Sequence, residues 1–130
     1  MEISKDSDLM ALHRAIVEAK FKDSPNDEAI PFSGILSRLS HEIFDSIVES
    51  LTNQGEIDEA EEWNNIRKLS VDWSGYSLIK QRIEETGVWL DLSHGDKIEL
   101  IKVLCSPYKP SVEQLDELLL TGNSRHHNKQ

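Results

Sequence analysis

The apolar residues of this chain recur at the three- and four-residue spacing of an α-helix along most of its length. In one stretch Leu36, Leu39 and Ile43 form a single stripe, and charged residues occupy the opposite side. Similar stripes predict helices over residues 7–22, 33–53, 56–70, 76–86, 94–105 and 111–122. Ser7 is the candidate N-cap of the first helix. Clusters of Gly, Pro, Ser, Asn and Asp separate the stripes and predict short connectors.

Two pairs of residues mark the starts of the last two helices. Ser93 with Asp96, and Ser111 with Gln114, have the spacing of an N-cap residue and its reciprocal partner three positions later. Residues 88–92 are rich in branched and aromatic side chains, which favour a strand, but a lone strand has nothing to pair with. We therefore expect this segment to be an extended connector.

These elements predict an all-α protein, a single compact bundle of about six helices with short connectors and no significant sheet. With 130 residues, of which 38% are hydrophobic, the chain is long enough for one core and short for two domains. We expect one helical domain over residues 1–122, with Gly122 ending the last helix, and a disordered polar tail over residues 123–130.

Charge is the strongest functional signal in the sequence. The chain carries 24 Asp and Glu against 14 Lys and Arg, a net charge of -10, and residues 31–70 contribute -5 from eight acids and three bases. Such a surface repels phosphate backbones and anionic lipids, so we expect neither nucleic acid nor membrane binding. It attracts basic proteins. The alternative is that the acids only keep the protein in solution.

The candidate partner-binding site lies between residues 56 and 76, where carboxylates alternate with aromatic residues. Aromatic rings would supply buried area, and carboxylates would steer and pair with Lys or Arg of a basic partner. The site comprises Asp58, Glu59, Glu61, Glu62, Trp63, Asp72, Trp73 and Tyr76. Two other interpretations stay open. The acids also suit the N-terminal dipole of their own helix, and the tryptophans could be core residues under an acidic coat.

The sequence contains no recognisable catalytic motif. It lacks Glu-x-x-His, His-Glu-x-x-His, Gly-x-Ser-x-Gly and phosphate-binding glycine loops, so we expect no enzyme activity, no metal and no cofactor. His41 and Asp45, four residues apart, are expected to form an exposed ion pair, and His94 lies in a capping turn. The single cysteine, Cys105, falls in an apolar helical pattern and is expected to be a buried thiol.

We interpret the chain as a cytoplasmic binding protein, with no apolar segment long enough to span a membrane. The leading hypothesis is an immunity- or antitoxin-type inhibitor whose carboxylates imitate the phosphates that a basic partner, such as a nuclease toxin, is built to hold. One alternative is a small acidic chaperone or adaptor for a secreted or regulatory protein, with an exposed apolar groove and a dimeric state. Another is a metal-dependent helical hydrolase, which requires His41, Asp45 and His94 to converge. The partner's identity and the oligomeric state stay open.

Overall fold

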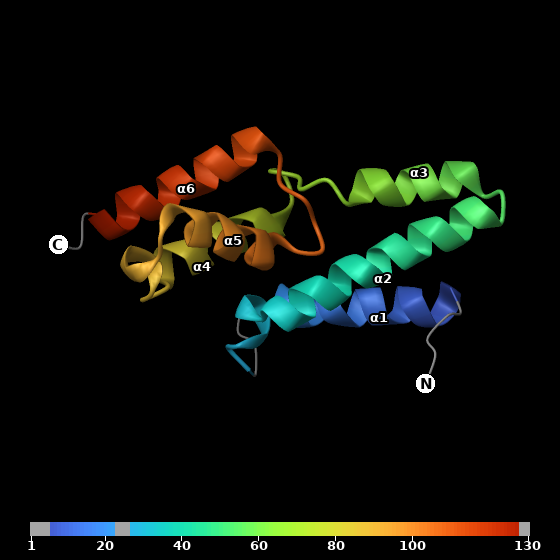
Figure 1. The fold of residues 1–130 in the computed structure, drawn as a ribbon, viewed down its shortest axis with the longest axis horizontal. Helices are drawn as coiled ribbons and strands as arrows, with labels where there is room; N and C mark the ends of the chain where they lie inside the picture. The colour runs from blue at the N-terminus through green and yellow to red at the C-terminus, as the bar shows by residue number, and fades with distance from the viewer. Residues whose placement is uncertain (1–5, 23–26, 128–130) are drawn as a thin grey trace.

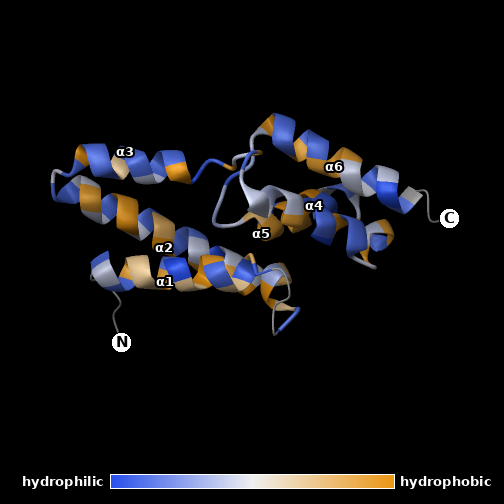
Figure 2. Ribbon diagram, turned by 180° about the vertical axis from the view of Figure 1, so that it is seen from behind, coloured by the Kyte–Doolittle hydropathy of each residue, from blue (hydrophilic) through white to orange (hydrophobic). Residues whose placement is uncertain are grey.

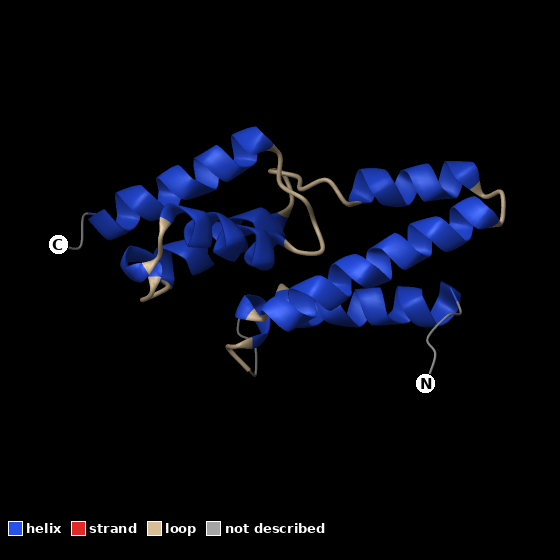
Figure 3. Ribbon diagram, viewed as in Figure 1, coloured by secondary structure: helices blue, strands red, loops and turns tan. Residues whose placement is uncertain are grey.

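The computed structural model describes residues 6–22 and 27–127, and within these ranges the protein is all-α (Figures 1 and 3). The helices are α1 (Asp6–Lys20), α2 (Gly34–Asn53), α3 (Ile57–Ile66), α4 (Ser74–Glu85), α5 (His94–Cys105) and α6 (Val112–His127). Two short 3₁₀ turns, η1 (Ile30–Phe32) and η2 (Trp89–Asp91), precede α2 and α5. In the described ranges, β-type pairing is limited to an isolated parallel bridge between Lys68 and Lys109. The predicted bundle of six helices is confirmed.

The helices lie in two groups of three, α1 to α3 beside α4 to α6 (Figure 1). Within the described residues, the buried apolar side chains likewise form two clusters. One cluster contains Leu9, Ile47 and Leu51, and the other extends from Leu69 to Leu119. Figure 2 shows that the helices carry polar as well as apolar residues, as amphipathic helices do. Where the sequence suggested one core, the structure has two neighbouring clusters.

Side-chain caps begin the last two helices as the spacing predicted. Ser93 Oγ accepts a hydrogen bond from the backbone N–H of Asp96 at 3.1 Å. In α6 both halves of the capping box form, because the Gln114 N–H donates to Ser111 Oγ at 3.1 Å and the Ser111 N–H donates to Gln114 Oε1 at 2.7 Å. Gly55, at φ 80°, follows α2 in the left-handed conformation that favours glycine.

Several predictions about local structure were wrong. Ser7 lies inside α1, which begins at Asp6, so it is not the N-cap. The helix predicted over residues 56–70 ends earlier, at Ile66. Arg67, expected in its last turn, is instead the C-cap residue of α3, and its side chain is buried. The 88–92 segment is not an extended connector, since Trp89–Asp91 form a 3₁₀ turn in which Trp89 is fully buried. Local patterns did not reveal these inward-facing side chains.

The last helix continues past Gly122 to His127, so the prediction that it ends at Gly122 was wrong. Residues 123–127, expected to be a disordered tail, are helical, and residues 128–130 lie outside the described ranges. Tertiary contacts hold this extension in place. His126 is buried, its Nε2 lies 2.8 Å from the carbonyl oxygen of Ile83, and its ring stacks on Trp89 with centroids 6.0 Å apart.

Gly122 has a packing role rather than a terminating one. A Cβ at this position would lie 2.3 Å from the ring of Trp89. Trp89 has no exposed surface, and its Nε1 donates to Asn123 Oδ1 at 3.1 Å, so the ring has little freedom to shift. Glycine is therefore the residue that allows η2 and α6 to approach each other closely.

This contact predicts that Gly122→Ala destabilises the protein, although alanine is the better helix former. Overpacking a core costs about 1–3 kcal/mol, and the gain in helix propensity is about 1 kcal/mol. We expect the free energy of unfolding, measured in urea, to fall by up to about 2 kcal/mol. Gly95→Ala in α5 is the control, because nothing lies within 4 Å of its added Cβ. Equal effects of the two substitutions would contradict this account.

Candidate functional site

The carboxylates of α3 form an exposed acidic face. Asp58, Glu59, Glu61 and Glu62 are all exposed, and α3 contains no basic residue. Helical spacing places Asp58, Glu61 and Glu62 on the side opposite the buried Ala60. None of the four carboxylates forms an ion pair with another described residue. We call this surface the α3 acidic face, and no cation among residues 6–22 and 27–127 forms an ion pair with its carboxylates.

Apolar side chains flank the α3 acidic face at its two ends. Ile57, at the start of the helix, is 48% exposed, and Ile66, at its end, is 52% exposed. Asp72 is also exposed, in the turn between α3 and α4, where its N–H lies 3.3 Å from Ser70 Oγ. The surface around the carboxylates therefore offers apolar contact area as well as charge, but from isoleucines rather than from aromatic residues.

The aromatic members of the predicted site point into the protein. Trp63 is half-buried and packs edge-to-face against Phe44, with ring centroids 5.4 Å apart. Trp73 is half-buried against Phe21 at 4.7 Å. Tyr76 is buried in the second apolar cluster, and burial raises its pKa to about 12. The structure therefore brings Asp58, Glu59, Glu61 and Glu62 together but does not gather the aromatic residues beside them.

A buried lysine connects the two groups of helices. Lys20, at the end of α1, has no exposed surface, and its ammonium donates to the carbonyl oxygens of Val103 and Ser106 at 2.7 and 2.6 Å and also to Ser106 Oγ. These acceptors belong to the end of α5, where carbonyls lack partners within their own helix. Burial lowers the pKa of Lys20 to about 7. This role could not be predicted from the local pattern, because a lysine at a helix C-terminus is ordinarily solvated.

Two arginines are also buried, one across the junction between the groups and one beside it. Arg82 of α4 donates to the carbonyl oxygens of Lys20 and Lys22, the latter at 2.9 Å. Arg67 reaches α2, where it pairs with Asp45 at 2.5 Å and donates to the carbonyl oxygen of His41 at 3.3 Å. Lys20 and Arg82 therefore join the two groups by donating to backbone oxygens, whereas the Arg67 side chain ties the end of α3 to α2 within the first group.

The predicted ion pair between His41 and Asp45 is not formed, because both residues contact Arg67 instead. Asp45 accepts from one guanidinium nitrogen, and His41 Nδ1 lies 3.3 Å from another. His41 is half-buried rather than on a solvated face. Its pKa is lowered, first by burial and then by the positive charge of Arg67.

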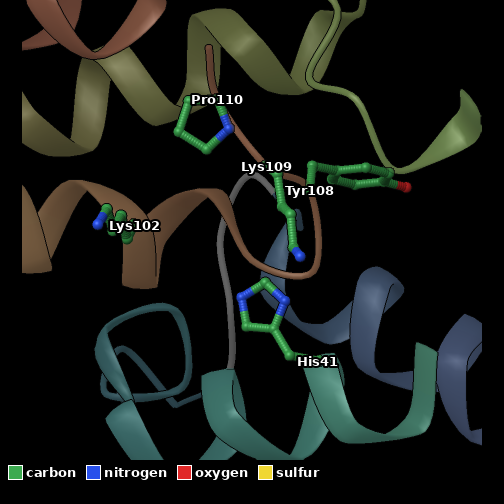
Figure 4. Close-up of a pocket in the computed structure, with 5 residues that line it drawn as sticks. All are labelled: His41, Lys102, Tyr108, Lys109 and Pro110. Atoms are coloured by element: carbon green, nitrogen blue, oxygen red, sulfur yellow. The ribbon is translucent and has the colours of Figure 1, made fainter. Parts of the chain in front are cut away.

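A pocket opens beside this junction (Figure 4). It has a volume of about 270 Å³ and lies between α2, the end of α5 and the segment leading into α6. The residues that line it are His41, Lys102, Tyr108, Lys109 and Pro110. We call it the junction pocket, and sequence reasoning missed it because its residues come from distant parts of the chain.

An apolar groove runs between α1 and α2, with a volume of about 470 Å³. Its lining is almost wholly apolar, from Leu9, Leu12, Ile16, Leu36, Leu39 and Ile43, with Glu42 and Ser46 at one edge. Leu39 is 39% exposed, and Ile35, one turn earlier in α2, is 69% exposed. The chain therefore has an exposed apolar groove of the kind that the chaperone or adaptor interpretation requires.

The geometry required for the metal-dependent alternative is not present. Over residues 6–22 and 27–127, no three His, Cys, Asp or Glu side chains converge in a way that could hold a metal ion. His94 is exposed at the first residue of α5. Cys105 is fully buried, as predicted, and burial raises its pKa to about 12, which keeps the thiol protonated.

No protein-family model, no curated protein and no solved structure matches this chain. In the part of the chain that the structure describes, no helix has both the length and the apolar character needed to cross a membrane. The residues and their arrangement therefore carry the functional argument.

The buried Lys20 predicts that stability rises with pH between 7.0 and 8.5. An unfolded lysine keeps its proton up to about 10.5, whereas folded Lys20 has a pKa of about 7, so the unfolded chain binds more protons in this range. The free energy of unfolding should rise by up to about 1.4 kcal/mol per pH unit. His13 and His41, with lowered pKa values, titrate below this window, and the raised pKa of Cys105 acts above it.

Urea unfolding at pH 7.0, 7.75 and 8.5 measures this slope. Lys20→Met should lose the dependence on pH as well as stability, because it leaves the carbonyls of Val103 and Ser106 without their donor. The same slope in the native protein and in Lys20→Met would show that another group is responsible. The comparison of slopes also cancels the contribution of the chain's α-amino group.

Proposed function

We propose that this protein binds a basic protein partner through the α3 acidic face, as an immunity- or antitoxin-type inhibitor of a nuclease would. The observation that carries the proposal is the set of exposed carboxylates Asp58, Glu61 and Glu62 on one side of α3, unpaired with any described cation. Unneutralised charge of one sign raises the rate at which an oppositely charged partner associates.

The spacing of these carboxylates suits a cleft that holds phosphates. Residues three and four positions apart along a helix are separated by about 4.5–6 Å of rise, so the face presents a row of negative charges along one line. Lys and Arg placed to bind successive phosphates could pair with such a row. Ile57 and Ile66 would supply the apolar contacts at its ends.

Packing beneath α3 supports a preorganised surface. The ring of Trp63 contacts His13 of α1 at 5.3 Å and Phe44 of α2 at 5.4 Å, so α3 is held against both neighbouring helices. A rigid contact face loses less conformational entropy on binding. Trp63 would therefore hold α3 in place from its buried side and would not itself contact the partner. A cytoplasmic location is part of the proposal, and a single buried thiol requires no oxidising compartment.

Charge reversal tests the α3 acidic face. Glu61→Lys with Glu62→Lys should weaken binding of a basic partner at least tenfold, about 1.4 kcal/mol, mainly through slower association. The partners to titrate are purified basic proteins encoded by neighbouring genes. The control is Glu113→Lys with Asp116→Lys, which changes the net charge equally on the exposed surface of α6.

The two double variants separate a contact surface from bulk charge. We expect the α6 pair to change the affinity less than about threefold, because distant charges are screened at physiological salt. Equal losses from both pairs, or no binding to any basic neighbour, would leave the acids as a solubility device. Circular dichroism would confirm that both variants keep their helices.

The α1/α2 groove supports a second candidate, an adaptor that holds an apolar, basic segment of another protein. On α2 the residues Ile35, Leu39, Glu42, Ser46 and Glu49 follow one another at helical spacing along the groove edge. Apolar contacts at one end and carboxylates towards the other suit an amphipathic helix with Lys or Arg beside its apolar stripe. A second copy of a chain with net charge -10 would be repelled, which favours a basic occupant.

A fluorescent dye specific for apolar surfaces tests the groove directly. Leu39→Asp should reduce dye emission, whereas Leu120→Asp, an equally polar change at a 67% exposed residue of α6 outside the groove, should not. If partner binding is lost in Leu39→Asp and kept when the α3 carboxylates are reversed, the adaptor function is favoured. Equal emission from both variants would show that the groove does not bind apolar molecules.

A further inference from the structure

The junction pocket has a charge opposite to that of the molecule as a whole. Among the described residues that line it there is no carboxylate, although the chain has a net charge of -10. Lys109 forms no ion pair with a described residue, and Lys102 has only a loose contact with Glu99 at 3.9 Å, with both side chains more than half exposed. Two lysines therefore face one cavity without a counter-ion from the described part of the protein.

The backbone holds Lys109 at the mouth of the pocket. Its N–H donates to the carbonyl oxygen of Arg67 at 2.8 Å, and its own carbonyl oxygen accepts from the N–H of Leu69 at 3.2 Å. In Figure 4 the ammonium end of Lys109 extends towards the ring of His41, while the ring of Tyr108 points away from it. Lys109 therefore extends from the segment that precedes α6, in the second group of helices, towards His41 of α2, in the first group.

His41 presents a hydrogen-bond donor to the pocket. Its Nδ1 lies 3.3 Å from a guanidinium nitrogen of Arg67, and a guanidinium can only donate, so Nδ1 accepts. In the neutral ring the proton must then be on Nε2. Three residues that line the pocket therefore carry hydrogen-bond donors, the ammonium groups of Lys102 and Lys109 and the Nε2–H of His41, and each residue comes from a different segment of the chain.

From this arrangement we propose that the junction pocket binds a phosphate group. Donor-bearing residues from three segments suit a tetrahedral ion with several acceptor oxygens, and lysine binds phosphate as a point charge. A planar carboxylate is better matched by the fork of an arginine, and the one arginine near the pocket already pairs with Asp45. A volume of about 270 Å³ suits one phosphate group rather than a whole nucleotide.

The phosphate can come from free inorganic phosphate or from a phosphorylated molecule whose remainder lies outside the pocket. Inorganic phosphate is the first probe, titrated at constant ionic strength while the ring resonances of His41 are followed by NMR. We expect a dissociation constant on the order of 1 mM. Phosphoserine amide and adenosine monophosphate then distinguish the sources, because a larger natural ligand should bind more tightly than phosphate alone.

Lysine substitutions assign the site. Lys109→Ala and Lys102→Ala should each weaken phosphate binding about fivefold to tenfold, the loss of one charge-assisted hydrogen bond. Both side chains are exposed, so folding should be unaffected. The control is Lys22→Ala, which removes an equal charge from an exposed residue that does not line the pocket. Its affinity should match that of the native protein.

The outcomes are distinct. A saturable shift of the His41 resonances that Lys109→Ala weakens and Lys22→Ala does not would support the site. No shift at 20 mM phosphate, or equal weakening by all three substitutions, would overturn it, because the response would then reflect overall charge alone. Acetate that binds as tightly as phosphate would also overturn the assignment to a tetrahedral anion.

Discussion

The insertion of Lys20 into the end of α5 is the interaction on which the arrangement of the two helix groups depends. The last carbonyls of a helix lack intrahelical partners and carry partial negative charge, so a cation from another element is well suited to satisfy them. Removing an ammonium from water costs several kcal/mol, and the hydrogen bonds to Val103 and Ser106 offset this cost. The lowered pKa of Lys20 shows that burial still disfavours its charge.

This mode of joining the halves also shapes the surface. Lys20 and Arg82 are buried at the junction and Arg67 is buried beside it, so three of the 14 basic side chains are withdrawn from the exterior. The outside of the protein is therefore more acidic than its net charge suggests. At the same point Lys109, held by the backbone of Arg67, remains exposed beside His41. The burial of these cations thus makes the exterior more acidic, and the backbone pairing of Lys109 with Arg67 leaves a basic pocket within that exterior.

Much of the secondary structure could be predicted, because it depends on neighbouring residues. Apolar periodicity located six helices, and the capping residues Ser93 and Ser111 form the hydrogen bonds expected of them. Exposure of Glu61 and Glu62 also follows from the position of Ala60 on the apolar side of the same helix. The candidate site was predictable to the same extent, since its carboxylates share a face by helical spacing alone.

The sequence by itself determined the helical character of the chain, the N-caps of its last two helices and its acidic face, because each of these depends on residues within a few positions of one another. Tertiary structure decided where Trp63 and Trp73 point, why Gly122 lies inside a helix, and which cations are buried. A ring or a lysine has the same local pattern whether it faces solvent or a second group of helices. Contacts between segments that are distant in the sequence determine which surface such a side chain covers and which pocket remains open.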